Sequence, residues 1–175
     1  MSLLITPATA PDAPAITALL TRAFARLSSH YPADILAPLM PYFGTCQPAL
    51  IASGRYFALR EDGVIRAVGG WSEGAPGTGA VVPGTGHIRH VGVDPDAGGK
   101  GFGRALLSAI EADAAANGIA RLEAFANRPA IPFYRALGYV EIGARTDMIA
   151  GKYPFEGMDL AKSLSGPAGA LRPVP

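Results

Sequence analysis

Hydrophobic and polar positions along the chain change their spacing several times, which indicates a mixture of strands and helices. Apolar residues from Leu3 to Ile5 predict a first strand, and Thr9 to Asp12 provide capping residues for a following helix. The apolar residues that share one face of this helix are Ile16, Leu19, Leu20 and Phe24. A second, shorter helix is predicted near Ala33 to Met40, ending before Pro41.

The middle of the chain alternates between strands and glycine-rich turns. Residues Tyr56 to Leu59 and Val64 to Trp71 flank a turn at 61–63, which predicts an antiparallel hairpin. A long connection rich in glycine and proline, from Ser72 to Gly86, leads to a β-branched strand from His87 to Val93. This connection either covers a cleft or is a long surface loop.

The last part of the chain continues the mixture of helices and strands. A helix after Pro95 carries an apolar face of Leu106, Leu107, Ile110 and Ala114 and stops at Asn117-Gly118. The remaining predicted elements are a strand at Arg121 to Ala126, a short helix at Phe133 to Leu137 that starts at Pro132, a strand at Tyr139 to Ile142 and a strand near Met158 to Ala161. The order of elements predicts an α+β fold.

The composition supports one folded domain. With 175 residues, of which 49% are hydrophobic and 17% charged, the chain can bury roughly two thirds of its unfolded surface in one core. We assign residues 1–165 to this domain and residues 166–175 to a flexible tail, because the end of the chain reads SGPAGALRPVP. A formal net charge of +1 gives no general attraction to nucleic acid or to an anionic membrane, so any phosphate site must be local.

The sequence indicates neither export nor membrane insertion. The amino terminus has only a short apolar stretch and no basic leader, and no segment approaches the roughly 18 apolar residues that span a bilayer. We therefore expect a cytoplasmic protein. Cys46, the only cysteine, excludes an intramolecular disulfide and a cysteine-rich zinc site, and we expect a small buried thiol, with a reactive thiol as the alternative.

Candidate chemistry begins with the sequence GGKGFG at Gly98 to Gly103, between a predicted strand and a predicted helix. Because glycines have no Cβ atom, successive backbone N–H groups can approach a phosphate closely. The positive end of the helix dipole favours an anion, and Lys100 and Arg104 add formal charge. A pyrophosphate suits such a loop, and the alternative is a glycine-rich turn without a ligand.

Two common phosphate-binding motifs do not fit this loop. A P-loop requires Ser or Thr directly after its Gly-Lys pair, whereas Gly101 follows Lys100. A dinucleotide fingerprint counted from Gly101 requires glycine at Leu106, and one counted from Gly99 requires glycine at Arg104. A P-loop or nicotinamide enzyme is therefore a distant alternative.

A longer segment, VGVDPDAGGKGFGRALL from Val91 to Leu107, resembles the acetyl-coenzyme A motif of GCN5-related N-acetyltransferases (GNATs). In that family a strand ends in Val-x-Pro and the next helix opens with Arg/Gln-x-x-Gly-x-Gly/Ala, whose first position is Gly98 here. Downstream, NRPAIPFYRALGY from Asn127 to Tyr139 resembles the family's Asn-x-x-Ala-x-x-Phe-Tyr-x-x-Leu-Gly-Phe/Tyr segment. The upstream elements follow the family's order, so the resemblance covers roughly residues 2 to 164.

The resemblance implies a mixed, mostly antiparallel sheet with helices on both faces and a splayed pair of central strands. It also implies acetyl-coenzyme A as cosubstrate, no metal, and transfer of the acetyl group to a primary amine by direct attack. The coenzyme-binding residues that it implies are Val91, Val93, Gly98, Gly99, Lys100, Gly101, Phe102, Gly103, Arg104 and Asn127. Among these, the N–H of Val91 is expected to polarise the acetyl carbonyl and that of Val93 to hold the pantetheine arm.

Two catalytic residues follow from the resemblance. Tyr134 matches the tyrosine that protonates the departing thiolate in many members, and its alternative is a packed helix aromatic. His87 lies four residues before Val91, where some members carry a catalytic glutamate, and histidine is suited to accept the proton of the amine. The alternative for His87 is a hydrogen-bonded histidine without a catalytic role. His90 is expected to face the other side of the strand, because side chains alternate along it. Glu73 is a second candidate base.

The acyl acceptor is the partner that the sequence defines least. We expect a small-molecule or peptide amine, and neither nucleic acid nor membrane. In related folds the acceptor cleft is lined by the first two helices and their connection, here Phe24 to Cys46, where Tyr31, Tyr42 and Phe43 line a pocket or belong to the core. The alternatives are transfer of a longer acyl group and a non-catalytic acyl-coenzyme A sensor or interaction module on the same fold. Many relatives pair as dimers, which leaves a homodimer open.

Overall fold

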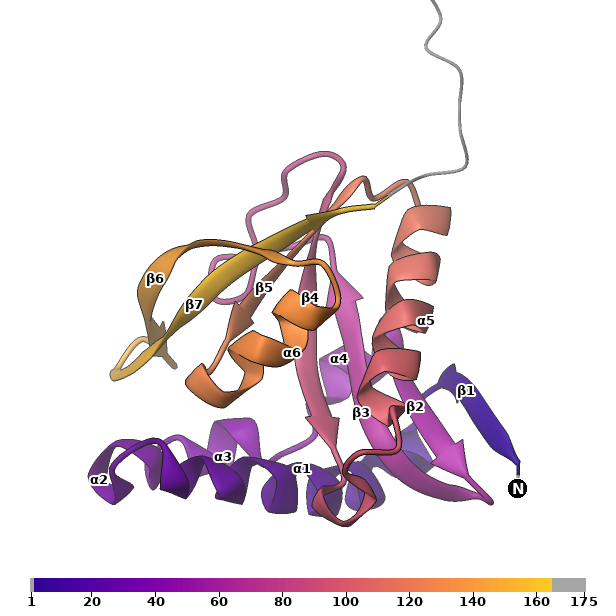
Figure 1. Ribbon diagram of the computed structural model, residues 1–175, viewed down its shortest axis with the longest axis horizontal. Helices are drawn as coiled ribbons and strands as arrows, with labels where there is room; N and C mark the ends of the chain where they lie inside the picture. The colour runs from indigo at the N-terminus through magenta and orange to yellow at the C-terminus, as the bar shows by residue number, and fades with distance from the viewer. Residues whose placement is uncertain (1, 165–175) are drawn as a thin grey trace, which may run out of the picture.

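A seven-stranded sheet with helices on both faces organises residues 2–164, which are the residues that the computed structural model describes (Figure 1). The strand order is β1-β2-β3-β4-β5-β7-β6, and every neighbouring pair is antiparallel except β4 and β5. The predicted α+β fold with a mostly antiparallel sheet is confirmed. The predicted tail at 166–175 lies outside the described residues.

The elements of the first half are β1 (Leu3–Pro7), α1 (Ala13–Ala25), α2 (Ala33–Leu36), α3 (Met40–Phe43), α4 (Pro48–Ala52), β2 (Tyr56–Glu61) and β3 (Val64–Ser72). Apolar residues at helical spacing give α1 one buried face, formed by Ile16, Leu19 and Leu20 as predicted. The first strand and the hairpin of β2 and β3 around Asp62 and Gly63 are also confirmed.

The prediction of one helix from Ala33 to Met40 that ends before Pro41 is wrong. The chain forms two separate turns, α2 and α3, and Pro41 lies in the first turn of α3. Proline lacks the N–H that a helix interior needs, but the N–H groups of a first turn have no partner within the helix. Pro38 therefore lies between the two turns, and Pro41 is tolerated as the second residue of α3.

The elements of the second half are β4 (Thr85–Val93), α5 (Phe102–Ala116), β5 (Arg121–Ala126), α6 (Ile131–Ala136), β6 (Val140–Ile149) and β7 (Tyr153–Ser163), with 3-10 turns η3 (Pro95–Ala97) and η4 (Arg128–Ala130). The helices α5 and α6 and the strand β5 are confirmed. Strands β6 and β7 are longer than predicted because they form a hairpin, in which β7 also pairs with β5 along its second half. Pairing extends these strands beyond their apolar runs.

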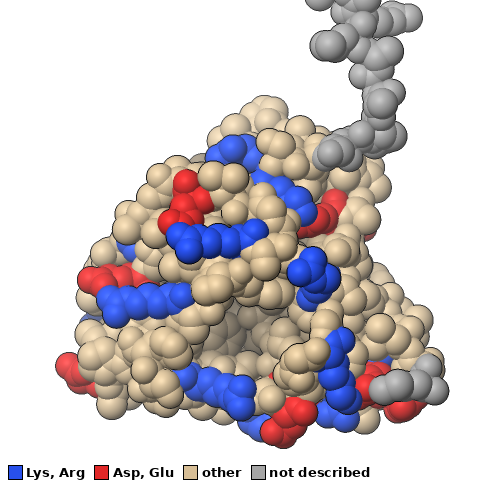
Figure 2. Space-filling model, in the orientation of Figure 1, with Lys and Arg blue, Asp and Glu red and all other residues tan. Residues whose placement is uncertain are grey.

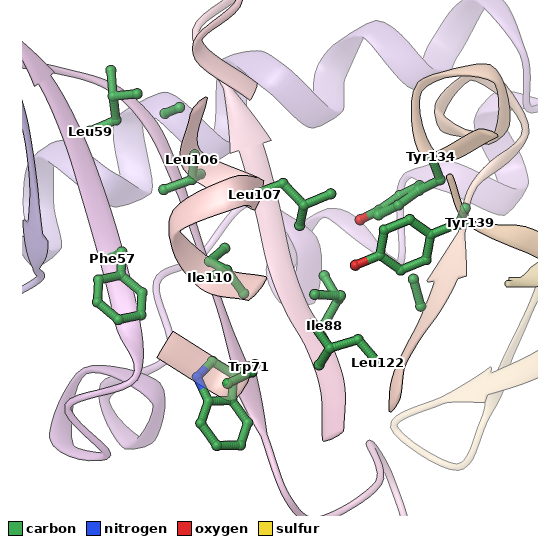
Figure 3. Close-up of a cluster of buried hydrophobic side chains, with 14 of the residues drawn as sticks. Phe57, Leu59, Trp71, Ile88, Leu106, Leu107, Ile110, Leu122, Tyr134 and Tyr139 are labelled. Atoms are coloured by element: carbon green, nitrogen blue, oxygen red, sulfur yellow. The ribbon is translucent and has the colours of Figure 1, made fainter. Parts of the chain in front are cut away.

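Apolar side chains fill the space on both sides of the sheet. On one side Leu106, Leu107 and Ile110 of α5 pack with Trp71 and Leu122 of the sheet (Figure 3). On the other side α1 packs against β3 and β4. Cys46 belongs to this second cluster, and burial raises the pKa of its thiol, which supports the predicted small buried thiol rather than a reactive one.

The glycine-rich connection between β3 and β4 lies beyond the amino-terminal end of β4 (Figure 1). A bridge between Gly74 and Val81 closes it on itself, and Val81 and Val82 are exposed. The glycine loop at Gly98 to Gly103 follows the opposite end of β4. This position supports the interpretation of 72–86 as a surface loop.

Candidate active site

The strands β4 and β5 separate soon after they meet. Parallel pairing joins Thr85, Gly86 and His87 to Arg121, Leu122 and Glu123. Beyond these residues β4 continues to Val93 and β5 to Ala126, but the two strands no longer pair with each other. The expected splayed pair of central strands is confirmed, and it leaves a gap whose β4 edge has no strand partner.

Val91 and Val93 direct their N–H groups into this gap. The N–H of Asp94 donates to the carbonyl of Arg66 on β3 at 2.7 Å. Because N–H groups alternate in direction along an extended strand, that of Gly92 also points to β3, and those of Val91 and Val93 point toward β5. Both are hydrogen-bond donors available to a molecule that lies between the strands.

A β-bulge at His90 changes which side chains face α1 and α3. His90 has a φ of +49°, and the register between β3 and β4 shifts opposite it. Its carbonyl accepts a hydrogen bond from the buried Tyr56 hydroxyl at 2.9 Å, and its Nε2 lies 2.6 Å from the carbonyl oxygen of Phe43 on α3. The prediction that His90 faces away from His87 is wrong, because the bulge interrupts the alternation of side chains.

The glycine loop and the start of α5 present a row of unpaired amides. No backbone N–H from Gly98 through Arg104 donates a hydrogen bond to another residue in the described part of the chain. Gly99 and Gly101 have φ values of +78° and +77°, which favour glycine, and Gly101 is the residue that caps α5. Since α5 is 15 residues long, its dipole adds a positive field at this end. The loop has the geometry of an anion-binding site.

A cavity of about 350 Å³ connects this loop to α6. Its lining residues are Val93, Ala97, Gly98, Gly99, Gly101, Phe102, Gly103, Arg104, Phe133, Ala136 and Leu137. A Cβ atom on Gly103 would lie only 3.1 Å from the Phe133 ring and 3.3 Å from Val93. The two sequence segments singled out above therefore meet at one cavity, and glycine at 103 allows their close approach.

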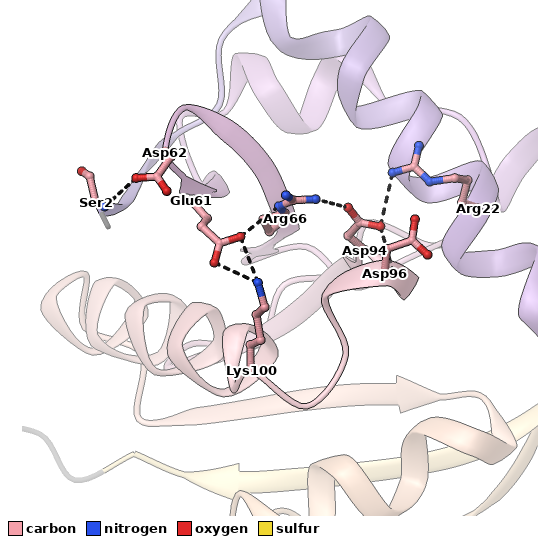
Figure 4. Close-up of polar contacts among 8 residues, drawn as sticks. All are labelled: Ser2, Arg22, Glu61, Asp62, Arg66, Asp94, Asp96 and Lys100. Atoms are coloured by element: carbon pink, nitrogen blue, oxygen red, sulfur yellow. Dashed lines mark hydrogen bonds and ion pairs between the residues drawn. The ribbon is translucent and has the colours of Figure 1, made fainter.

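The charged residues of the loop differ in their surroundings. Arg104 is exposed at the cavity and forms no ion pair within residues 2–164. Lys100 places its ammonium 3.1 Å from Oε1 of Glu61, a buried carboxylate on β2 (Figure 4). The charge of Lys100 is therefore partly compensated, whereas that of Arg104 is available to a ligand.

An ion-pair network behind the loop fixes the turn that follows β4 (Figure 4). Arg66 pairs with both Glu61 and Asp94, and Arg22 of α1 also approaches Asp94. Burial alone would raise the pKa of Asp94, but hydrogen bonds from the N–H of Asp96, from Arg66 and from Arg22 outweigh it and lower the pKa. The spacing of residues along the chain did not indicate this network, because its members come from α1, β2, β3 and the turn after β4.

Tyr134 lies on α6 with only 6% of its surface exposed. Its ring packs edge-on against Tyr139 with centroids 5.3 Å apart (Figure 3). Burial raises the pKa of Tyr134, so the phenol keeps its proton across the neutral range. Asn127, at the end of β5, accepts the Ala130 N–H with Oδ1 and caps η4.

His87 lies where β4 and β5 are still paired, with 12% of its side chain exposed. Its Nδ1 is 3.8 Å from Oε2 of Glu123, while its Nε2 is buried without a hydrogen-bond partner in the described part of the chain. Burial lowers the pKa of His87 more than the nearby Glu123 raises it. Glu73, the second candidate base, is half-exposed and pairs with Arg55.

The aromatic residues expected at the acceptor cleft separate into two groups. Tyr31 belongs to the core: it stacks on Phe155, donates to the carbonyl of Glu156 and accepts the N–H of Arg128. Tyr42 is exposed and Phe43 is half-buried against Phe155. In Figure 2 the molecule is hollowed between α6 and the layer of α1 to α3, and Lys and Arg side chains surround this hollow.

The comparisons with known proteins agree with this geometry. The profile of the Acetyltransferase (GNAT) family matches residues 14–139, so the chain belongs to this family. No curated protein matched the sequence.

Similar solved structures include a GCN5-related N-acetyltransferase from Rhodopseudomonas palustris, with 23% identity and a TM-score of 0.72 over 94% of this chain and 97% of that one. The paia N-acetyltransferase from Thermoplasma acidophilum, solved with coenzyme A, has 12% identity and a TM-score of 0.70 over 93% and 99%. The yncA protein from Salmonella typhimurium, a putative acetyltransferase solved with acetyl-CoA, has 20% identity and a TM-score of 0.65 over 97% and 98%. At these identities the likeness shows the fold.

No helix within residues 2–164 is both long and apolar enough to cross a membrane. The same residues contain no group of three or more His, Cys, Asp or Glu side chains that would hold a metal ion.

Proposed function

We propose that the protein transfers an acetyl group from acetyl-coenzyme A to a primary amine of a small molecule or peptide, by direct attack of the amine on the thioester. The observation that carries this proposal is the row of unpaired amides from Gly98 through Arg104, at one end of the gap between β4 and β5. Membership of the acetyltransferase family supports the same chemistry.

In this proposal the amides of Gly98, Gly99, Lys100, Gly101, Phe102, Gly103 and Arg104 bind the pyrophosphate, and the guanidinium of Arg104 adds charge. The cavity between Gly103 and Phe133 accommodates the part of the coenzyme next to the phosphates. The N–H of Val93 holds the pantetheine arm, and Asn127 contacts it from just beyond the end of β5.

The acetyl transfer then needs one hydrogen bond and two proton movements. The N–H of Val91 donates to the thioester oxygen and stabilises the negative charge that develops there. As the carbon–nitrogen bond forms and the carbon–sulfur bond breaks, Tyr134 gives its proton to the sulfur. His87 accepts the proton of the amine through water, because four residues of strand place it about 10–13 Å from Val91.

Release of free thiol from acetyl-coenzyme A, in the presence of a panel of amines, amino acids, aminoglycosides and peptides, tests this function. Tyr134→Phe is expected to lower kcat about 100-fold, because it removes the proton donor, and to change the Kd of coenzyme A little. Tyr139→Phe is the matched control, since Tyr139 is also buried and its ring packs against Tyr134. Coenzyme binding without thiol release for any acceptor would contradict catalysis and favour a sensor. Equal kcat in wild type and Tyr134→Phe would remove Tyr134 from the mechanism.

A further inference from the structure

Arg89 on β4 is a half-buried arginine without a carboxylate partner. Of the arginines within residues 2–164, Arg26, Arg89 and Arg104 form no ion pair, and Arg26 and Arg104 are exposed. Charged groups are seldom withdrawn from water without a partner, because desolvation costs several kcal/mol. An unpaired arginine in a half-buried position therefore indicates a binding site for an anion from outside the chain.

The surroundings of Arg89 supply hydrogen bonding but no negative charge. Its Nη1 donates to Oγ of Ser72 at 3.0 Å, and that hydroxyl donates to the carbonyl of Gly74. The carboxylates of Glu73, just after β3, and of Glu123 on β5 already pair with arginines 55 and 121. Burial lowers the pKa of Arg89, which reflects the missing counter-charge.

Arg89 faces the side of the sheet opposite to α5. Ile88 packs in the cluster under α5, so the next residue along the strand points to the other face, as His87 does. The coenzyme cavity borders α5 and α6, whereas Arg89 and His87 belong to the face covered by α1 and α3. An acceptor that reaches the gap from this face passes Arg89.

We propose that Arg89 binds a carboxylate of the acceptor, so that the substrate is an amino acid-like molecule with the carboxylate a few bonds from its amine. This inference rests on the proposed acetyl transfer. Arg89 and Val91 are two residues apart across the bulge at His90, so at most about 7 Å of backbone separates them, a distance that one small molecule can span between the guanidinium and the thioester carbon. One guanidinium with its planar pair of donors matches a singly charged carboxylate, whereas a phosphate monoester carries more charge than this site balances.

Matched acceptors test the carboxylate. We would compare each L-amino acid with its carboxamide, at saturating acetyl-coenzyme A, and measure kcat and KM from thiol release. The wild type is expected to prefer the acid over the amide by about 10- to 100-fold in kcat/KM, mainly through KM, because a hydrogen-bonded charge pair is lost with the amide. A peptide with an amino-terminal glutamate and a blocked carboxyl end distinguishes a side-chain carboxylate from a free main-chain one.

Arg89→Gln is expected to bring the ratio of acid to amide close to one, and Arg89→Lys to give an intermediate ratio. Arg135→Gln is the matched control, because Arg135 is exposed on α6, lies outside the segment expected to line the acceptor cleft, and its removal changes the net charge equally. It should leave the ratio unchanged. Equal use of acids and amides by the wild type, or an unchanged ratio in Arg89→Gln, would overturn the inference while acetyl transfer to amines stands. Absence of thiol release with every acceptor would instead overturn both.

Discussion

The two candidate ligand sites beside β4 are built from different parts of the chain. On the side of α5 the candidate coenzyme site consists of backbone amides, glycines and one apolar cavity, with Arg104 as the free charge. On the side of α1 and α3 the site consists of side chains, His87 and Arg89, with His90 tied to α3. A backbone site requires small residues at fixed spacing, so it leaves a motif in the sequence. A side-chain site can change one residue at a time, so we expect it to determine the specificity for the acceptor.

Gly103→Val is expected to have the largest effect on the coenzyme side of β4. A Cβ at this position meets Phe133 at 3.1 Å and Val93 at 3.3 Å, and the larger side chain would enter the coenzyme cavity. We expect the Kd of coenzyme A, measured by calorimetry, to rise roughly 10- to 100-fold, as overpacking costs about 1–3 kcal/mol.

Gly98→Ala is the control for this variant, because the nearest atom to a Cβ at 98 is the Pro95 carbonyl oxygen at 3.6 Å. Its Kd for coenzyme A should stay within about twofold of the wild type, because substitutions at exposed positions usually have small effects. If Gly103→Val binds coenzyme A as tightly as Gly98→Ala does, the cavity between the loop and α6 is not the coenzyme site.

His87→Gln tests the acceptor side of β4. Histidine accepts a proton only in its neutral form, and burial lowers the pKa of His87 below its ordinary value of 6.5. The wild-type kcat should therefore persist below pH 6.5 and fall only when the pH drops through this lowered pKa. His87→Gln should lose that acidic limb and about 10-fold in kcat near pH 7, less than for a direct base because water relays the proton. A limb unchanged in the variant would assign the titration to another group.

Gly98→Arg is expected to have the smallest effect, and it tests whether added charge strengthens binding by the loop amides. The backbone at Gly98, with φ −59° and ψ 148°, suits any residue, and the space around a Cβ is open. An arginine here adds a charge beside the amides, which we expect to lower the Kd of coenzyme A about 3- to 10-fold at low salt and less at high salt. Unchanged or weaker binding would mean that the amides alone determine affinity.

Local sequence signals predicted most of the fold and the position of the glycine loop before α5. The strand β5, the face of α5 and the glycine at the end of that helix follow from spacing and from turn chemistry, which neighbouring residues determine. The bulge at His90 was missed, because Tyr56, a residue from another strand, holds its carbonyl. The full length of β6 and β7 was also missed, since it depends on pairing between them.

The acceptor side of β4 shows most clearly what could not be predicted from the sequence. Arg89 was not among the residues predicted from sequence, although alternation along the strand puts it on the same face as His87; it became a candidate only when the ion pairs of the other arginines were known. Tyr31 could not be assigned to pocket or core from sequence, because its hydroxyl bonds to Glu156 and Arg128, about a hundred residues away. Contacts across such separations leave no periodic signal.

The most direct test of the central claim is a crystal structure of the protein with coenzyme A. We expect the pyrophosphate oxygens within hydrogen-bonding distance, about 2.7–3.2 Å, of the backbone nitrogens between Gly98 and Arg104, and the pantetheine arm between β4 and β5 beside the N–H of Val93. A coenzyme bound elsewhere, or bound with these nitrogens free and the gap between the strands empty, would contradict the account.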